Sequence, residues 1–290
     1  MSSQLSDTDL ILNKDGSVYH LHLREEHIAT DVIVVGDQDR VAQISNHFDQ
    51  VELRIKNREF VTHTGTIGKK RITVLSTGIG TDNIDIAINE LDAAINIDAK
   101  TRQPKDKKRK LNIIRIGTSG TLQENIPVGA QVISEFGLGL DGVLHYYQYE
   151  ANDIELEIQE KIIHHLKLNT AFATPYICKV STPLFNQLRH GMIEGITATA
   201  PGFYGPQGRI IRLATKYPNI NEELQSFAYK NHRITNFEME TSALYGLGNL
   251  LGHDCCTCCA IIANRIRKEF SEDYHQQVDR LIETVLERIV

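Results

Sequence analysis

One short stretch, Leu111–Gly120 (LNIIRIGTSG), places the tightest limit on how this chain can fold. It begins as an apolar run of the kind that a fully buried central strand needs, and the pattern predicts that the strand ends at Ile116. Arg115 lies inside the run, and a guanidinium is almost never buried unpaired, so its head group should meet an anion near the strand's carboxyl end. The turn predicted at Gly117–Gly120 would bring backbone N–H groups and hydroxyls to the same point, which favours bound phosphate. An ion pair between Arg115 and a structural carboxylate remains the alternative.

Similar apolar, β-branched runs recur along the chain and alternate with amphipathic helical patterns. Helical stripes are clearest at Ile84–Ile95 and Val278–Ile289. Strands alternating with such helices predict a single-domain, three-layer α/β/α fold with a mixed, largely parallel central sheet. The predicted strands are Asp31–Val35, Ile72–Ser76, Leu111–Ile116, Ala130–Phe136, Tyr176–Ser181, Ile193–Ala200 and Cys255–Ala263.

Small residues follow three of these strands. Val35–Arg40 follows the first strand and leads into a helix, Ser76–Gly80 follows the second, and Gly117–Gly120 follows the third. In such sheets ligands bind beyond the carboxyl ends of the strands, where glycine-rich turns gather. A single anion held by several strand ends explains this pattern more simply than three unrelated turns.

The composition, 41% hydrophobic and 23% charged over 290 residues, is that of an ordinary soluble globular chain. No signal-peptide pattern and no long uncharged apolar window are present, so a cytoplasmic protein without a membrane partner is expected. Four of the five cysteines crowd into Cys255–Cys259, which favours core packing over disulfides or a metal site. Lys100–Lys110 carries a net charge of +6 and is predicted to be a solvated loop; the remainder sums to −12, so nucleic acid is not an expected partner.

Two later segments carry groups that could bind a small polar ligand. Phe203–Arg209 (FYGPQGR) is a loop by its Gly and Pro content, and its rings, amide and guanidinium could hold a flat heterocycle; a plain surface loop is the alternative. Asn236–Thr241 opens a helix predicted to run to Leu251, and its two glutamates either cap that helix or accept sugar hydroxyls. Gly137–Gly142 matches G-x-G-x-x-G, but no convincing helix start follows, so a dinucleotide site is not predicted.

Taken together, these segments resemble the nucleoside phosphorylase-I family, and within it the members that cleave uridine. The similarity extends from about Val18 to the last helix, which implies an N-terminal extension (1–17) and one phosphorylase-like domain (18–290) with a basic loop insertion at about 99–110. Eight motifs in the family's order are far more specific than any one of them. They are VYHLHL, VVGDQDRV, NREF, STGIG, RIGTSG, FYGPQGR, NFEMET and ANR.

The resemblance implies a role for each matching residue, with catalysis carried by Arg115, Glu240 and Arg209. Phosphate would be bound by Gly36, Arg40, Arg115 and Thr118, joined by Arg58 from a neighbouring subunit. Ribose would be held by Met239, by Glu240 and, at its 5′ end, by a neighbour's His20. Uracil would lie against Ser119, Gly120, Phe203, Gln207 and Arg209, with Arg265 supporting the pocket. A monovalent cation such as K⁺ could lie between subunits at Glu59, Ile79 and Asn83.

The reaction implied is the reversible phosphorolysis of uridine to uracil and ribose 1-phosphate. Phosphate would be a co-substrate, no organic cofactor would be needed, and the working unit would be a homo-oligomer of dimers, expected to be a hexamer. A purine nucleoside phosphorylase remains an alternative, although such enzymes carry an aspartate near the position of Asn264–Arg265. The second alternative is a non-catalytic nucleoside-binding protein. Such a protein would be expected to have lost Glu240 or the arginines that bind phosphate. The chain departs from the family's pattern at Gln38, Gly205–Pro206 and Asn83.

Overall fold

The computed structural model describes residues 4–168 and 171–290, so the first three residues of the N-terminal extension lie outside it. Strands and helices alternate along much of the chain. The strands are β1 (Asp31–Val35), β2 (Gln50–Asn57), β3 (Phe60–Ile67), β4 (Lys70–Ser76), β5 (Ile97–Asp98), β6 (Gln103–Pro104), β7 (Asn112–Thr121), β8 (Gln131–Gly139), β9 (Tyr176–Lys179), β10 (Ile193–Thr199), β11 (Ala228–Tyr229), β12 (His232–Glu238), β13 (Asp254–Asn264) and β14 (Glu269–Phe270). The α-helices are α1 (Gln38–Ser45), α2 (Thr81–Asn96), α3 (Asp153–Leu166), α4 (Thr182–Leu188), α5 (Ile220–Ser226), α6 (Thr241–Leu251) and α7 (Tyr274–Ile289), with short 3-10 helices at Glu25–His27, Val143–Tyr146 and Gly205–Gln207.

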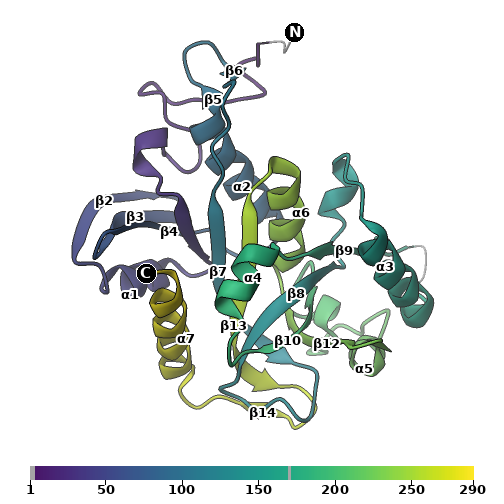
Figure 1. Ribbon diagram of the computed structural model, residues 1–290. Coiled ribbons are helices and arrows are strands. Elements are labelled where there is room, and N and C mark those ends of the chain that lie inside the picture. The colour runs from purple at the N-terminus through teal and green to yellow at the C-terminus, as the bar shows by residue number, and fades with distance from the viewer. Residues whose placement is uncertain (1–3, 169–170) are drawn as a thin grey trace.

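A twisted sheet organises the molecule (Figure 1). Its strand order is β11-β12-β10-β8-β13-β7-β1-β4-β3-β2, with β9 beside β8 and β14 beside β13. β4, β1, β7 and β13 are parallel neighbours, whereas β3 and β2 extend the sheet as antiparallel strands. Because β12 pairs with β7 as well as with β10, the strands β7, β13, β8, β10 and β12 close into a barrel. The predicted mixed sheet is confirmed.

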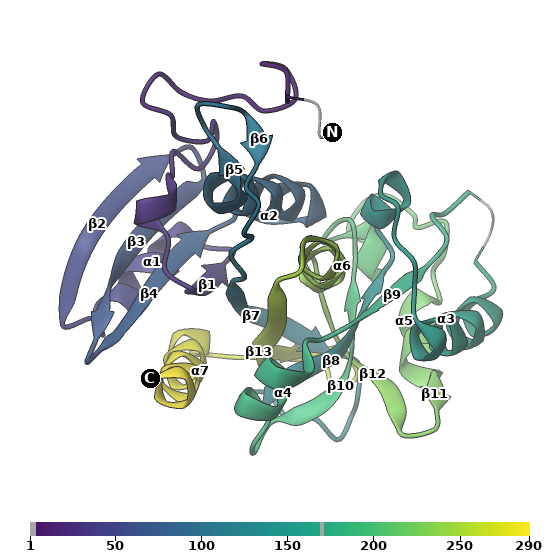
Figure 2. The same cartoon turned by 45° about the horizontal axis from the view of Figure 1, so that its top comes forward.

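Helices cover both faces of this sheet and complete a three-layer α/β/α domain. α2 and α6 lie together on one face, and α4 and α7 lie on the other (Figure 2). The larger buried cluster joins β1, β4, β7 and β13 to these helices, and a second cluster joins β8, β10 and β12 to α3 and α5. Among the described helices, none combines the length and the apolar content needed to cross a membrane.

The central strand is longer than the sequence predicts. β7 continues past Ile116 to Thr121 and pairs with β13 throughout, so Gly117–Gly120 is not a turn. The prediction was wrong because Gly117 serves a different purpose: a Cβ there would lie 2.1 Å from Nη1 of Arg115. Glycine therefore makes room for a buried guanidinium inside a continuous strand.

Three of the longer strands, β2, β3 and β12, were not predicted, and neither were the two-residue strands β5, β6, β11 and β14. Asn236–Glu238 ends β12, and α6 begins only at Thr241, so the helix predicted from Asn236 was wrong at its start. The signal for β2 was present, because apolar and charged residues alternate there, and its apolar positions are the more buried ones. That half-buried pattern was masked by the high charge of the segment.

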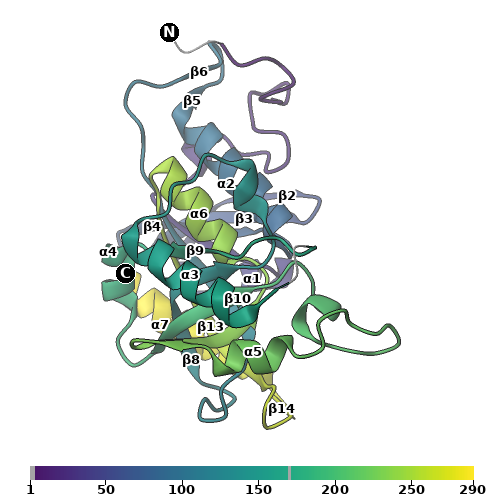
Figure 3. The same cartoon turned by 90° about the vertical axis from the view of Figure 1, so that its right-hand side faces the viewer.

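The basic segment Lys100–Lys110 was predicted to be a solvated loop, but part of it is structured. It includes β6, which pairs with β5 just before the segment, and it lies with the N-terminal residues at one end of the molecule (Figure 3). Arg102 donates hydrogen bonds to the carbonyl oxygens of Leu5 (3.0 Å) and Ser6 (2.7 Å), so the basic segment anchors the N-terminal residues. The cysteines of Cys255–Cys259 are free and buried within β13, which confirms core packing.

Candidate active site

A cavity of about 1000 Å³ lies where β1, β4, β7 and β12 end. Most of the residues that the resemblance singled out line this one cavity. They are Gly36, Arg40, Glu59, Ile79, Asn83, Arg115, Thr118, Ser119, Gly120, Phe203, Gln207, Arg209, Met239 and Glu240. The structure does not bring His20, Arg58 or Arg265 into its lining.

Arg40 is a buried cation of this cavity. It lies in the first turn of α1, which follows β1 and is capped by the side chain of Asp37. Its Nη1 donates to the carbonyl oxygen of Ile116 at 3.3 Å, and its buried Nε has no hydrogen-bond partner among the described residues. No carboxylate of the described chain lies within ion-pair distance of Arg40, and burial lowers the pKa of its guanidinium. Such a group favours an incoming anion.

Arg115, in contrast to Arg40, lies next to two carboxylates. Its guanidinium bonds to Glu240 through Nη2, and Nη1 lies 3.3 Å from a carboxylate oxygen of Glu238. Burial opposes the charge of Arg115, but the two carboxylates raise its pKa. The anion that the sequence predicts for Arg115 is thus a pair of protein carboxylates, which is the alternative that the sequence left open.

The two glutamates at and just after the end of β12 have separate roles. Glu238 accepts the backbone N–H groups of Glu240 (2.9 Å) and Thr241 (3.0 Å), so it caps α6. Glu240 accepts the N–H of Gly80, at the start of α2, at 2.8 Å. Burial raises the pKa of Glu240, although Arg115 opposes the shift. The role of Glu238 as a partner of Arg115 was missed, and only its place in the NFEMET motif could have suggested it.

Phe203, Gln207 and Arg209 form one hydrogen-bonded and stacked unit at the cavity wall. The guanidinium carbon of Arg209 lies 3.8 Å from the centroid of the Phe203 ring, and Nη1 donates to Oε1 of Gln207 at 2.6 Å. Gln207 is 4% exposed, so its amide is fixed by its surroundings. Burial, with the nearby positive charge of Arg265, lowers the pKa of Arg209 to about 10. These contacts hold the loop in the wall of the cavity, so it is not a plain surface loop.

Arg265 lies behind the cavity. Its backbone N–H donates to the carbonyl oxygen of Thr121 at 3.0 Å, and its Cγ is 3.8 Å from where a Cβ of Gly120 would lie. Ser119 accepts a hydrogen bond from Nδ2 of Asn236 at 3.0 Å, which fixes its hydroxyl. The position of Arg265 suits the supporting role that the resemblance implies.

Glu59, Ile79 and Asn83 lie together around Gly78. A Cβ at Gly78 would be 3.2 Å from Cγ of Glu59 and 2.4 Å from Nδ2 of Asn83. Asn83 donates to the carbonyl oxygen of Ile79 at 3.3 Å. The cluster offers a carboxylate, a carbonyl and an amide oxygen, which are the ligand types that hard cations prefer. Ile79 is exposed, so this side of the cluster is open to solvent.

His20 and Arg58 lie close to each other, outside the cavity. Asn57 donates from Nδ2 to the carbonyl oxygen of His20 at 2.8 Å. The guanidinium of Arg58 lies over the ring of Tyr19 at 5.4 Å and donates to its hydroxyl at 3.3 Å. Two segments that are distant in sequence therefore present both residues on one part of the subunit.

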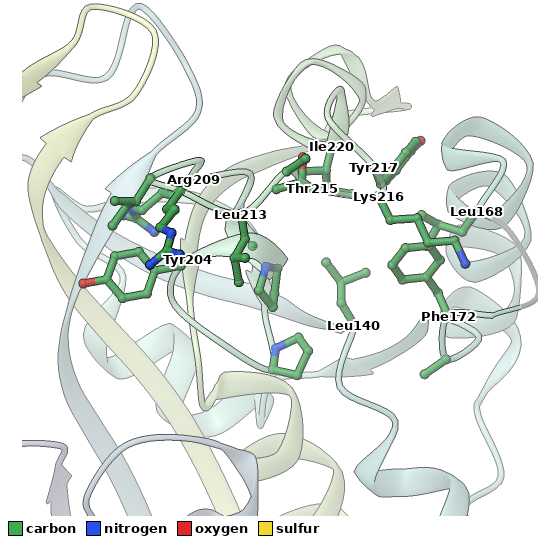
Figure 4. Close-up of a pocket in the computed structure, with 17 residues that line it drawn as sticks. Leu140, Leu168, Phe172, Tyr204, Arg209, Leu213, Thr215, Lys216, Tyr217 and Ile220 are labelled. Carbon is green, nitrogen blue, oxygen red and sulfur yellow. The ribbon is translucent and has the colours of Figure 1, made fainter.

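A second cavity of about 570 Å³ shares Arg209 with the first one (Figure 4). Tyr204 and Arg209 are at one end of it, and Leu168 and Phe172 are at the other. Its lining is largely apolar and includes Leu140, Leu213 and Ile220. The acidic residues and the buried arginines of the first cavity are missing from the described residues that line it, so the first cavity is the candidate active site.

Comparison with known proteins finds relatives along nearly the whole chain. The model of a family described as the phosphorylase superfamily matches residues 30–290. A protein of Thermococcus kodakarensis named uridine phosphorylase is 31% identical over 265 residues, which cover 89% of this chain and 82% of that protein. One of Haemophilus influenzae with the same name is 29% identical over 262 residues, 88% of this chain and 90% of that protein.

The fold has a close match among solved structures. A nucleoside phosphorylase of Trypanosoma brucei, described as showing uridine phosphorylase activity, superposes with a TM-score of 0.88 and 29% identity. The match covers 97% of this chain and 99% of that one. Since the family model spans residues 30–290, this chain belongs to the phosphorylase superfamily.

Proposed function

We propose that this chain is a uridine phosphorylase, which uses inorganic phosphate to split uridine into uracil and ribose 1-phosphate. The observation that carries this proposal is Arg40, whose buried guanidinium lacks a carboxylate partner among the described residues. It shares its cavity with Glu240 and with the unit of Gln207 and Arg209. An anion, a sugar and a pyrimidine would each find matching groups in this one space.

Phosphate would bind between the ends of β1 and β7. Arg40 supplies a guanidinium without an ion-pair partner among the described residues, Gly36 and Thr118 offer N–H and hydroxyl donors, and Arg115 adds a second guanidinium. Arg115 would then bridge the phosphate and Glu240, while Met239 and Glu240 hold the ribose. The phosphate and the ribose would then lie next to each other, each in contact with one member of the buried Arg115–Glu240 pair.

Uracil would lie against Ser119, Gly120 and the unit of Phe203, Gln207 and Arg209. Uracil presents two carbonyl acceptors and one N–H donor, which an amide and a guanidinium can match. Asn264 supports pyrimidine over purine, because this amide is structural. Its Nδ2 donates to the carbonyl oxygen of Ile126 at 2.8 Å, and its Oδ1 accepts the N–H of Arg267 at 2.9 Å. A carboxamide is a hydrogen-bond donor and acceptor but not an acid, so Asn264 cannot protonate a purine as an aspartate can.

The mechanism follows from these positions. As the C1′–N1 bond lengthens, the sugar becomes oxocarbenium-like and negative charge spreads over uracil. The arginines hold phosphate below C1′, Glu240 orients the sugar by its hydroxyls, and Arg209 stabilises the charge on the departing ring. The attack of phosphate oxygen on C1′ forms the C1′–O bond of ribose 1-phosphate as the C1′–N1 bond breaks. The uracil anion then takes up a proton from water, which balances the proton that the phosphate group loses. No strong base is needed.

The active site would be shared between two subunits. His20 and Arg58 lie on one part of the subunit, outside their own cavity, and an isologous dimer would bring this part to the cavity of the partner. Arg58 would reach the phosphate there, and His20 would reach the 5′ end of the ribose. A ring of such dimers, a hexamer, is the assembly that we propose.

Two further features belong to this proposal. The oxygen atoms of Glu59, Ile79 and Asn83, together with those of a second subunit, would hold a monovalent cation such as K⁺ after the amide of Asn83 rotates to offer its oxygen. Residues 18–290 would form the catalytic domain, and residues 1–17 would be an extension outside the site.

A panel of nucleosides tests the base specificity. The release of free base from uridine, 2′-deoxyuridine, thymidine and inosine, each with phosphate, is measured for the unchanged protein and for Gln207→Ala. We expect uridine to be cleaved well and inosine poorly, and Gln207→Ala to lower uridine cleavage much more than it lowers the melting temperature. Inosine as the better substrate of the unchanged protein would rule out the proposal.

A further inference from the structure

The turn that carries His20 is held by a single carboxylate from another element. Glu90, in the middle of α2, accepts the backbone N–H of His20 at 2.9 Å and that of Leu21 at 2.9 Å. Its other oxygen lies 2.6 Å from Nδ1 of the His20 ring. One side chain thus fixes both the backbone of the turn and the ring at its tip.

These contacts determine which ring nitrogen carries the proton. An ionised carboxylate only accepts hydrogen bonds, so Nδ1 of His20 must be the donor, and a neutral ring then has its lone pair on Nε2. Within the described part of the chain, Nε2 has no hydrogen-bond partner. The side chains of His20 and Glu90 are 25% and 15% exposed, so the pair lies at the surface but is largely packed.

The helix that carries Glu90 also contacts the active-site cavity of the same chain. α2 begins at Thr81, directly after Gly80, whose N–H is bonded to Glu240. The same helix packs against α6, which starts after Glu240. The neighbouring Val18 and Leu21 are fully buried, so the turn itself is fixed to the core.

We propose that Glu90 is a positioning residue for nucleoside binding. It holds the His20 ring in one orientation and in the Nδ1–H tautomer, which leaves Nε2 to accept a hydrogen bond from the 5′-hydroxyl of the nucleoside. This inference rests on the proposed function, in which His20 serves the 5′ end of uridine. Glu90 belongs to none of the motifs on which the family resemblance rests. In this proposal it affects nucleoside binding only through His20.

The test compares two substrates that differ only at the 5′ position. The value of kcat/KM is measured for uridine and for 5′-deoxyuridine with the unchanged protein, Glu90→Gln and His20→Ala. A glutamine cannot replace the carboxylate, because it has only one acceptor oxygen. Its NH2 group, which donates, would face either Nδ1 of His20 or the backbone N–H groups. We expect the preference for uridine to fall about 3- to 10-fold in Glu90→Gln and in His20→Ala, the value of one hydrogen bond. The rate with 5′-deoxyuridine should stay within about twofold.

Asp85→Asn is the matched control, because Asp85 is a carboxylate on the same helix that bonds to Tyr147 instead. It should leave the preference for uridine unchanged. Glu90→Ala, which removes the tether completely, serves as the second variant should Glu90→Gln not fold. The combination of Glu90→Gln with His20→Ala should show no further loss of preference.

Two results would overturn the inference. If Glu90→Gln lowers the rates with both substrates equally, Glu90 has a structural role only. If the preference for uridine stays unchanged, Nε2 of His20 does not depend on Glu90. These results differ from a failure of the proposed function, in which the unchanged protein would cleave neither nucleoside in the presence of phosphate; the inference would then fall with it.

Discussion

Arg40 and Arg115 line one cavity but differ in what neutralises them. Arg115 is bonded to Glu240 and lies beside Glu238, whereas Arg40 has a carbonyl partner and a buried Nε without one among the described residues. Removing one partner of a buried ion pair leaves the other charge buried without a partner, which destabilises the fold. Removing a buried charge that has no ion-pair partner leaves no such charge behind. The two arginines should therefore respond differently to the same substitution.

Arg115→Met should destabilise the fold by about 3–5 kcal/mol, because two buried glutamates lose their cation. Arg40→Met should change stability by about 1 kcal/mol or less, or even raise it, yet lower kcat/KM for phosphate by roughly 10- to 100-fold or more. Chemical denaturation and initial rates measure the two effects. Equal destabilisation by both variants would contradict this assignment of partners.

Glu240 should set the acid limit of activity. Burial raises its pKa, so as the pH falls it takes up a proton earlier than an ordinary glutamate does. The sign for stability is opposite to that for activity: the folded state holds this proton more tightly than the unfolded chain, so protonation of Glu240 favours folding while it weakens the hold on the ribose. We expect kcat to fall on the acid side at a pH above the ordinary glutamate range. Glu240→Gln, measured at saturating phosphate, should lack this limb, and identical profiles would contradict the role of Glu240.

At the scale of single elements, β7 joins the fold to the site. Its glycines differ in surroundings: a Cβ on Gly117 would meet the guanidinium of Arg115 at 2.1 Å, whereas one on Gly120 would meet nothing closer than 3.8 Å. Arg115 cannot move aside without leaving Glu238 and Glu240. The strand is thus built around its arginine.

Gly117→Ala should therefore cost about 1–3 kcal/mol of stability from overpacking and should remove most activity by displacing Arg115. Gly120→Ala, on the same strand, should leave the melting temperature nearly unchanged. Thermal unfolding of the two variants checks this contrast. A similar melting temperature for both would mean that the guanidinium has room to move.

The elements also show where sequence patterns succeed and fail. Largely apolar runs such as β1 and the first half of β7 were predicted, because such runs are typical of strands that are buried on both faces. The second half of β7 was not predicted. Its glycines and hydroxyl residues are typical of a turn, and the sequence does not show that Gly117 is needed to make room for the guanidinium of Arg115. β12 was missed because only Met239 and Glu240 separate it from α6, and the sequence of Asn236–Glu238 fits either element.

Within the site, the ordered motifs indicated the residues that line one cavity, but not their partners. Nothing local in the sequence joins Arg115 to Glu240 or His20 to Glu90, because these pairs are 125 and 70 residues apart. Such contacts arise only when the sheet is assembled. The motifs therefore predicted the lining of the site better than its electrostatics.

At the scale of the whole molecule, the proposed sharing of sites makes a prediction about mixtures. Arg58→Ala and Glu240→Ala should each be inactive alone. If they are unfolded and refolded together, one site of a mixed dimer collects both defects and the other collects neither, so part of the activity should return. Mass spectrometry of the intact oligomers confirms mixing. Mixed oligomers without activity would show that Arg58 does not act across an interface.

The cation cluster makes a separate prediction for the assembly. If K⁺ lies between subunits near Glu59 and Ile79, replacing it by a bulky organic cation should lower the melting temperature and weaken the oligomer. Glu59→Gln should remove this difference. An equal melting temperature in both salts would mean that the cluster holds no cation.

Uracil release from uridine at increasing phosphate concentration, with ribose 1-phosphate measured in the same samples, tests the proposed reaction most directly. Because Arg40 is expected to hold the nucleophile itself, we expect no release without phosphate, a saturable rise with it, and equal amounts of the two products. Release of uracil at the same rate without phosphate, with free ribose as the second product, would show that water is the nucleophile and would contradict phosphorolysis.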